Sequence, residues 1–303
     1  MSEFADDIRR GLSATPKELP AKYFYDAVGS AIYEAITYLP EYGLTNADIR
    51  LLEKHARDAA SRMAEGFAVA ELGSGSGRKT RPVLEAAMRR VRYFPIDLSA
   101  SALEHCRVTL GDVACVEPVL DSFLDGLERV REEHREPLLV LFVGSSIGNF
   151  NPEDACEFLT AVRATLNDSD ALLLGVDLAK DERLVLQAYD DPAGVTAAFN
   201  LNLLARINRE LEGNFDLRAF EHEARYCDGP PRIEMHLRAA RACEAQAAGA
   251  TFRFEKGETI LTEKSHKYTE AMLGTLVTKA GFCAEAGWID EEWPFAELFL
   301  RPA

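Results

Sequence analysis

The stretch from residue 71 to residue 80, ELGSGSGRKT, carries the residue types most able to bind a small ligand through backbone. Gly73, Gly75 and Gly77 follow a short apolar run, FAVAEL. A turn of this composition lets the main chain approach a ligand closely, because glycine has no side chain and adopts left-handed conformations. The candidate ligands are a nucleotide phosphate, a dinucleotide, or a molecule that is bound without any phosphate contact.

The spacing of the turn separates these ligands. A P-loop requires G-x-x-x-x-G-K-[ST], whereas here Gly73 is too close to Gly77 and one extra residue precedes Lys79. A dinucleotide fingerprint, G-x-G-x-x-G, needs its third glycine where this chain has Arg78. The pattern G-x-G-x-G with Glu71 before it resembles motif I of the class I methyltransferases that use S-adenosylmethionine (SAM). A nicotinamide or flavin oxidoreductase and another α/β fold remain as alternatives.

A carboxylate follows the turn near the end of the next predicted strand. Asp97 lies 22 residues after Gly75, near the end of the second apolar run, YFPIDL. At this position a carboxylate would accept hydrogen bonds from ribose hydroxyl groups. Asp97 could instead cap the helix that SASAL begins, and it could serve both roles.

The turn and the carboxylate need a sheet to position them, and the chain predicts one. Apolar runs predict strands at 67–72, 93–98, 114–120, 138–144 and 171–178, and helical patterns at 46–65, 80–90, 99–110 and 152–166 alternate with them. For the first of these helices Thr45 is the expected N-cap, with Asp48 completing an approximate capping box. Strands that alternate with helices indicate a parallel α/β sheet.

The pattern changes after residue 180. Residues 181–225 read as helices and 226–265 as antiparallel strands, after which a helix and two strands return. We therefore predict a Rossmann-like domain formed by 46–180 plus 267–303. Residues 1–45 plus 181–266 are expected to form a second domain.

Composition limits the possible partners. The chain has 303 residues, a formal net charge of -16 and a pI of about 4.9, which disfavours nucleic acid and anionic membranes. No apolar run is long enough to span a membrane, and the first residues lack a signal-peptide pattern. Six scattered cysteines without a CxxC pair indicate reduced thiols and no zinc site. We expect a cytoplasmic monomer that binds small molecules and no metal.

Seven longer segments occur in a fixed order along the chain. They are ELGSGSGRKT, FPIDLSASAL, LFVGSSIGNF, GVDLAKD, YDDPAGVTAAFNLNLLARINRELEGNF, IEMHL and GETILTEKSHKY. From about Tyr23 to the C-terminus the chain resembles the L-histidine Nα-methyltransferases of ergothioneine biosynthesis. The resemblance implies a class I SAM-dependent methyltransferase (Rossmann-like) domain with an inserted α+β substrate-binding domain. It also implies trimethylation of the α-amino group of L-histidine to hercynine, with S-adenosyl-L-homocysteine as the second product.

The resemblance also assigns candidate residues. Those matching cofactor contacts are Tyr25, Gly73, Lys79, Asp97, Asp121 and Ser122. Those matching substrate contacts are Tyr42, Asn149, Tyr189, Met235, Glu263 and Ser265, of which Asn149 and Tyr189 would hold the amine and carboxylate and are the catalytic candidates. Glu263 and Ser265 would hold the imidazole, because a carboxylate accepts its N–H and a hydroxyl serves its other nitrogen.

Each of these residues has an ordinary structural alternative. Asn149 could cap the helix that follows it, and Tyr189 could belong to the core. Glu263 could form a surface pair with Lys264 or Lys267. Methyl transfer from a sulfonium to an amine is a direct displacement that requires no metal, so positioning is expected to dominate. The residue that accepts the amine proton is left unassigned.

One departure from the family pattern bears on the substrate. In PEYGLT, Gly43 follows Tyr42 where the family usually has a second aromatic residue. If that aromatic side chain shapes the imidazole pocket, Tyr42 must do so alone. The same chemistry on a different free amino acid is therefore an alternative, as is a cofactor-binding regulatory domain without turnover.

Overall fold

The chain folds into two compact units, each with its own sheet. The computed structural model describes residues 2–87 and 89–303. The large unit comprises Leu44–Ala179 and Lys267–Ala303, and the small unit comprises Met1–Gly43 and Lys180–His266.

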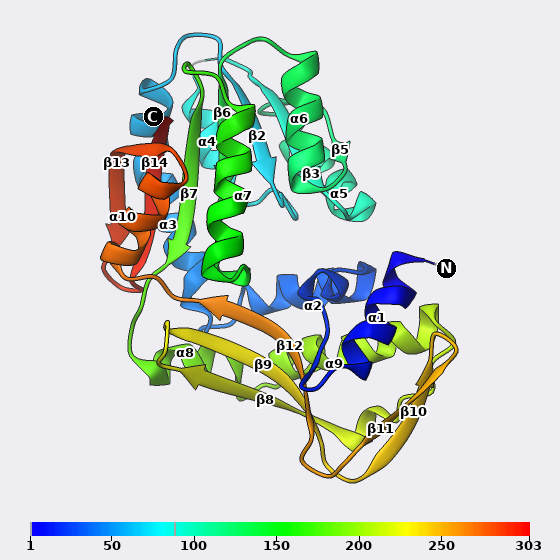
Figure 1. Ribbon diagram of the computed structural model, residues 1–303. Coiled ribbons are helices and arrows are strands. Elements are labelled where there is room, and N and C mark those ends of the chain that lie inside the picture. Colours follow the sequence, from blue (N-terminus) through cyan, green and yellow to red (C-terminus); the bar gives the residue numbers. More distant parts are fainter. Residues whose placement is uncertain (1, 88) are drawn as a thin grey trace. The chain divides into compact units, whose positions relative to one another are not determined.

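The large unit contains an eight-stranded sheet (Figure 1). Its strands are β2 (Ala68–Leu72), β3 (Arg92–Asp97), β4 (Cys115–Val116), β5 (Val119–Leu120), β6 (Leu138–Phe142), β7 (Ala171–Asp177), β13 (Phe282–Asp290) and β14 (Phe295–Pro302). The order is β13-β14-β7-β6-β2-β3-β4, with β5 also pairing β3. The strands from β2 to β7 pair in parallel, and β14 is antiparallel to both neighbours. Strand order reverses at β2, and ligands of open α/β sheets bind where it does so.

Helices cover both faces of this sheet. Alternate residues of β2 explain why: Ala68, Ala70 and Leu72 join the apolar cluster on one face, and Val69 joins the cluster on the other. The first cluster includes α6 (Phe123–Glu133), α7 (Pro152–Thr165) and α10 (Glu270–Lys279). The second includes α3 (Gly43–Ser61), α4 (Arg81–Ala86) and α5 (Ala100–Leu110). The predicted parallel α/β sheet is thus confirmed.

Two details of the large unit differ from the prediction. The run 114–120 forms the two short strands β4 and β5 where one strand was expected. Helix α3 begins at Gly43, before the expected start at residue 46. Thr45 therefore lies buried inside the helix and is not its N-cap. Asp48 is fully buried and makes a different contact, described below.

The small unit holds a four-stranded sheet and a separate hairpin (Figure 1). The sheet order is β1 (Lys17–Glu18), β12 (Thr259–His266), β9 (Arg232–Ala239) and β8 (Phe220–Cys227), and the hairpin is β10 (Cys243–Ala247) with β11 (Ala250–Phe254). The helices are α1 (Glu3–Ser13), α2 (Ala27–Ile36), α8 (Glu182–Tyr189) and α9 (Val195–Glu210), with short 3-10 turns η1 (Ala21–Phe24) and η3 (Leu217–Ala219).

Strand β8 corrects the expectation that 181–225 is helical. Its sequence, FEHEARYC, is polar and mostly half-exposed because the strand lies at the edge of the sheet. Apolar Phe220, Ala224 and Tyr226 alternate with charged residues, which is the period-two pattern of a strand with one wet face, but the strand has no continuous apolar run. The antiparallel pairing expected for 226–265 is confirmed for β9 with β12 and for β10 with β11.

Candidate active site

The glycine turn follows β2 in the large unit and packs tightly on one side. Gly73, Gly75 and Gly77 all have positive φ, of 77°, 51° and 72°. A Cβ atom at Gly77 would lie 2.6 Å from Cys106 Sγ and 2.7 Å from Leu110 Cδ1, so the turn rests on α5 through this glycine. A Cβ atom at Gly75 would meet nothing within 4 Å. The turn therefore presents bare backbone on an open side, where a ligand fits.

Asp97 joins this turn directly. Its Oδ2 accepts the Gly75 N–H at 3.1 Å, and its Oδ1 accepts the Ser99 N–H at 2.8 Å. Ser99, not Asp97, is the side-chain cap of α5, because its hydroxyl accepts the Ala102 N–H. Burial raises the pKa of Asp97, and these backbone hydrogen bonds oppose the shift. Each carboxylate oxygen keeps a further lone pair, which can accept a ligand hydroxyl.

Asp121 and Ser122 follow β5 beside Asp97. The Asp121 N–H donates to the Asp97 carbonyl at 3.3 Å, so the two residues are neighbours. The Asp121 carboxylate accepts the Ser122 N–H at 2.9 Å. The Ser122 hydroxyl caps α6, where it accepts the Asp125 N–H at 3.3 Å. The structure thus gathers Gly73, Asp97 and Asp121 at the carboxyl ends of adjacent strands.

Glu71 lies buried beneath the turn. It accepts hydrogen bonds from the Thr80 hydroxyl at 2.5 Å and from the Tyr93 hydroxyl. Burial raises the pKa of Glu71 to about 7, and the two hydroxyl donors oppose the rise. Both donors come from elements that flank the turn, so Glu71 ties β2 to β3 and to the start of α4.

Lys79, a predicted cofactor residue, forms an ion pair with a buried carboxylate. Its Nζ lies 2.8 Å from Oδ2 of Asp48, which α3 supplies. The carboxyl of Glu297 on β14 is 1% exposed and lies on the same face of the sheet as Asp48. A Cβ atom at Gly175 would lie 3.0 Å from Glu297 Oε1. Burial raises the pKa of Glu297 well above its usual range, and the Asp48 carboxylate raises it further. Both effects favour the protonated form of Glu297.

The raised pKa of Glu297 predicts a pH dependence of stability. A carboxyl that is protonated in the fold stabilises it fully below the unfolded pKa, near 4.5, and loses this contribution as pH rises toward the folded pKa. Glu297→Gln should remove this loss. We expect the free energy of unfolding of the variant, relative to the wild type, to increase as the pH rises above the unfolded pKa, by at most about 1.4 kcal/mol per pH unit for this single proton.

Urea unfolding at a series of pH values measures this difference. Exposed Glu291 provides the matched control, because Glu291→Gln changes the same group without burial. Parallel pH curves for the wild type and Glu297→Gln would show that Glu297 is ionised in the fold.

Asn149 ends the 3-10 turn η2 (Ser146–Asn149), which follows β6. The preceding Ser145 has a φ of 61°, and its hydroxyl accepts the Asp177 N–H at 2.9 Å. Asp177 in turn pairs with buried Lys267, with Nζ to Oδ2 at 2.9 Å. Non-glycine residues in the left-handed region cluster at active sites and ligand-binding loops. Helix α7 is preceded by Asn151 as its N-cap residue, so Asn149 is not the cap of that helix.

In the small unit a β-bulge sets the predicted substrate residues on one face. Leu261 of β12 pairs with His236 of β9, and Glu263 pairs with Met235, so Thr262 is the extra residue. The extra residue reverses the side-chain alternation of β12. Glu263 and Met235 consequently share a face of the sheet. Ser265, two residues further along β12, lies on this face as well.

Tyr189 and Tyr42 lie against this face. The Tyr189 hydroxyl donates to Ser265 Oγ at 3.0 Å, and the Tyr42 and Tyr189 rings meet edge to face at 6.1 Å. Burial raises the pKa of Tyr42 well above its usual range, and Tyr33, Tyr189 and Glu263 raise it further. The five predicted substrate residues of this unit are therefore brought together: Tyr42, Tyr189, Met235, Glu263 and Ser265.

The two lysines proposed as surface partners of Glu263 form ion pairs with other carboxylates. Lys264 Nζ lies 3.1 Å from Glu18 Oε1, and Lys267 pairs with Asp177.

Tyr25, a predicted cofactor residue, belongs to the small unit, where its ring meets Tyr33 at 5.6 Å and Phe199 at 5.9 Å.

The candidate residues thus fall into two groups, one in each unit. The large unit carries Gly73, Lys79, Asp97, Asp121, Ser122 and Asn149, and the small unit carries Tyr25, Tyr42, Tyr189, Met235, Glu263 and Ser265. Sequence reasoning missed the carboxyls of Asp48 and Glu297 beside Lys79. For Glu297 a signal existed: it is a lone carboxyl in the apolar run FAELFL, which predicts a buried and unusual acid.

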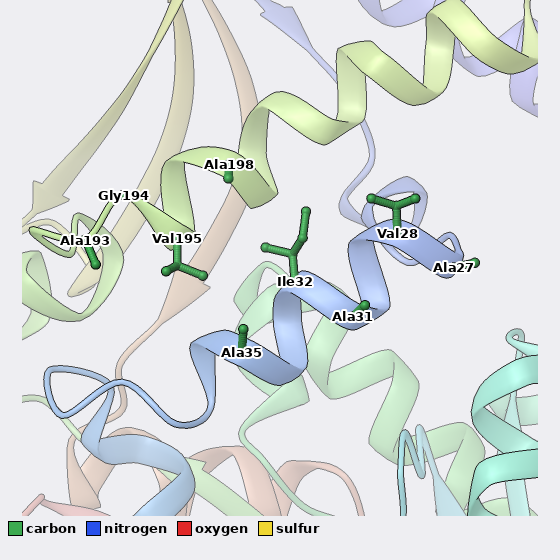
Figure 2. Close-up of a pocket in the computed structure, with 9 residues that line it drawn as sticks. All are labelled: Ala27, Val28, Ala31, Ile32, Ala35, Ala193, Gly194, Val195 and Ala198. Atoms are coloured by element: carbon green, nitrogen blue, oxygen red, sulfur yellow. The ribbon is translucent and has the colours of Figure 1, made fainter.

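A hollow elsewhere in the small unit does not hold the candidate site. It has a volume of about 660 Å³ and lies between α2 and α9 (Figure 2). Its lining side chains are all apolar: Ala27, Val28, Ala31, Ile32, Ala35, Ala193, Gly194, Val195 and Ala198. A lining without charged or polar side chains cannot hold a zwitterionic amino acid.

The described part of the chain lacks two further features. Within residues 2–87 and 89–303, no helix combines the length and apolar character needed to cross a membrane. The same residues contain no group of three or more His, Cys, Asp or Glu side chains able to hold a metal ion.

The strand order, the glycine turn after β2 and the acidic end of β3 define a Rossmann-like, SAM-dependent methyltransferase fold. The family described as "Histidine-specific methyltransferase, SAM-dependent" matches residues 4–302. The chain belongs to this family.

Two individual relatives carry names that match this family description. The histidine N-alpha-methyltransferases of Mycobacterium tuberculosis and Mycolicibacterium smegmatis are 41% and 40% identical to the chain, and each alignment covers 95% of this chain and 92% of the relative. A solved structure from Bordetella parapertussis, described as a possible exported protein, aligns with a TM-score of 0.50 and 14% identity. That alignment covers 99% of this chain and 79% of the other, and it concerns the fold alone.

Proposed function

We propose that the protein transfers methyl groups from SAM to the α-amino group of L-histidine, three times in succession, to give hercynine. The observation that carries the proposal is the pair Glu263 and Ser265 on one face of the bulged strand, with Tyr189 and Tyr42 against it. Neutral imidazole has one N–H donor and one acceptor nitrogen. A carboxylate and a hydroxyl satisfy these two groups, and a serine hydroxyl can accept one hydrogen bond and donate another.

The large unit supplies the half-site for the methyl donor. The open side of the glycine turn leaves room for the amino-acid part of SAM, and Asp97 is the acceptor for its ribose hydroxyls. Asp121, adjacent to Asp97, is placed to contact the adenine end. When bound, SAM provides an electrophilic methyl group on a sulfonium. The acidic surroundings of the turn suit this positive charge.

The chain contributes to the displacement mainly by holding the amine in position. The amine must be neutral, because its lone pair forms the new N–C bond while the S–C bond breaks. Asn149 and Tyr189 are proposed to orient the amine and carboxylate end, which turns an encounter in solution into an aligned reaction. Each transfer leaves a positively charged nitrogen, and the first two products must release a proton to water before the next transfer. No metal enters these steps.

Incubation with SAM and each free amino acid, followed by mass measurement, tests the proposed substrate. We expect mass gains of one, two and three methyl groups on histidine. The position of Gly43 favours one rival, because Tyr42 has no aromatic neighbour in sequence to narrow the pocket. Trimethylation of another amino acid in place of histidine would establish that rival. Binding of S-adenosylhomocysteine without turnover of any amino acid would instead indicate a regulatory domain.

We also propose that the enzyme works as a monomer in the cytoplasm. Its cysteines are free thiols, and Cys115 and Cys283 are exposed, as suits a reducing compartment. The net charge of -16 keeps copies of the chain apart by mutual repulsion.

A further inference from the structure

A chain of polar groups in the small unit ends at the backbone of Tyr189. Thr262 Oγ1 lies 2.8 Å from Asn200 Oδ1, and Asn200 Nδ2 lies 2.8 Å from His222 Nδ1. The other ring nitrogen of His222, Nε2, lies 2.8 Å from the Tyr189 carbonyl oxygen. These three side chains come from β12, α9 and β8. We call them the Asn200 network.

The direction of every hydrogen bond in the Asn200 network is fixed. Asn200 Nδ2 also lies 3.0 Å from the His236 carbonyl oxygen, which can only accept, so this amide atom must be the NH2 group. His222 Nδ1 therefore accepts from Asn200. His222 Nε2 faces the Tyr189 carbonyl, which also only accepts, so Nε2 carries the hydrogen. His222 is accordingly neutral, with its proton on Nε2.

The remaining contacts of the network are satisfied as well. Thr262 Oγ1 faces two acceptors, Asn200 Oδ1 and the Met235 carbonyl at 2.9 Å, so its hydroxyl donates and its one hydrogen is shared between them. Asn200 is 0% exposed and Thr262 is 1% exposed, so water does not compete for these groups. A fully satisfied buried network holds one arrangement of its members firmly.

The Asn200 network contacts the backbone of Tyr189 at the end of α8. Tyr189 is the last residue of α8, and carbonyl groups at a helix end have no partner within the helix. His222 supplies that partner, while Ser265 accepts from the Tyr189 hydroxyl at 3.0 Å. Tyr189 is thus held at both ends. Thr262 is also the bulge residue that places Glu263 beside Met235. One network therefore links the position of Tyr189 to the face of β12 that carries Glu263.

We propose that Thr262, Asn200 and His222 are positioning residues that set Tyr189 for the amino-acid substrate. Because this rests on the proposed function, Tyr189 is taken as a substrate contact. The network acts through Tyr189, and none of its three members is a candidate cofactor residue. Its loss is expected to weaken substrate binding and to leave the cofactor half-site unaffected.

Steady-state kinetics on matched variants tests the proposal. Asn200→Ser removes the amide of the network, and we expect the KM for histidine to rise about tenfold while the KM for SAM stays within about twofold. Asn208→Ser is the control: Asn208 lies on the same helix and makes two backbone hydrogen bonds to Phe215, at 2.9 Å and 2.8 Å, but has no link to Tyr189. It should lower Tm without changing the KM for histidine.

His222 offers a second pair. His222→Phe keeps a planar ring without either polar nitrogen and should reproduce the effect of Asn200→Ser. His222→Gln retains a donor and an acceptor and should restore much of the affinity for histidine. Equal KM values for histidine in Asn200→Ser, Asn208→Ser and the wild type would overturn the proposal. Absence of histidine turnover in the wild type would instead refute the proposed function.

A spectroscopic measurement examines the network in the wild type, and a variant serves only to assign the signals. Nitrogen-15 NMR of the histidine rings, with His222 assigned by its absence in His222→Gln, reports which nitrogen carries the proton. We expect the neutral form with its proton on Nε2. A proton on Nδ1, or a charged ring at neutral pH, would contradict the hydrogen-bond directions on which the network depends.

Discussion

Glu263→Ala is expected to lower kcat/KM for histidine by about 100-fold or more and to leave S-adenosylhomocysteine affinity within about twofold. The variant removes the acceptor for the imidazole N–H. The bound substrate then has an unpaired donor inside the pocket, which costs roughly 2–3 kcal/mol, and each 1.4 kcal/mol is a factor of ten. Steady-state kinetics with histidine and calorimetry with S-adenosylhomocysteine measure the two quantities separately.

Lys264→Ala is the matched control for Glu263→Ala. Lys264 is the next residue along β12 and extends from the other face, where it pairs with Glu18. Its loss should change neither quantity by more than about twofold, since partly exposed ion pairs contribute little. Equal losses of histidine and cofactor affinity in Glu263→Ala would place Glu263 outside the imidazole pocket.

Asp97→Asn is expected to have the complementary effect, with S-adenosylhomocysteine affinity reduced about 100-fold. Asp97 uses both carboxylate oxygens to accept backbone N–H groups, from Gly75 and Ser99. An amide would set its NH2 group against one of those N–H groups and would also lose an acceptor for the ribose hydroxyls. The substitution therefore disturbs the turn and the ligand contact together.

Calorimetry with S-adenosylhomocysteine measures the loss in Asp97→Asn, and Asp112→Asn serves as the control. Asp112 is exposed and pairs with Arg81 outside the turn. The control should bind S-adenosylhomocysteine as the wild type does. Wild-type affinity in Asp97→Asn, with the fold intact by circular dichroism, would remove Asp97 from the cofactor half-site.

The sheet of the large unit was predictable because its strands are buried on both faces. In β7 all seven residues, ALLLGVD, are buried, and a run of this kind reads as a strand without any partner being known. Strand β8 was not predictable in this way. At a sheet edge its side chains stay mostly half-exposed, so FEHEARYC has no apolar run and offers only a short alternation of Phe220, Ala224 and Tyr226 with charged residues.

The candidate cofactor residues depend on two kinds of sequence signal. The spacing of Gly73, Gly75 and Gly77 disfavoured a phosphate loop, and the position of Asp97 at a strand end suggested a ribose acceptor or a helix cap. Its hydrogen bond with the Gly75 N–H was not predicted. The roles assigned to Asp121 and Asn149 came from family resemblance. Neither residue has a spacing that would single it out.

The predicted substrate residues of the small unit depend on features that sequence patterns do not reveal. Regular alternation would set Leu261 and Glu263 on the same face of β12, and only the bulge at Thr262 separates them. The bulge is supported by Asn200, which lies far away in sequence. Likewise the burial of Asp48 and Glu297 beside Lys79 depends on α3 packing on the sheet, so helical periodicity suggested only a capping role for Asp48.

The central claim is that the α-amino nitrogen, and not the imidazole, receives the methyl groups. The most direct measurement uses SAM labelled with carbon-13 in its methyl group and histidine labelled with nitrogen-15 at the α-amino position, followed by NMR of the product. Three equivalent labelled methyl groups, all coupled to the α-nitrogen, are predicted. Labelled methyl carbon on an imidazole nitrogen, with the α-nitrogen unchanged, would contradict the assignment of Glu263 and Ser265 to the imidazole.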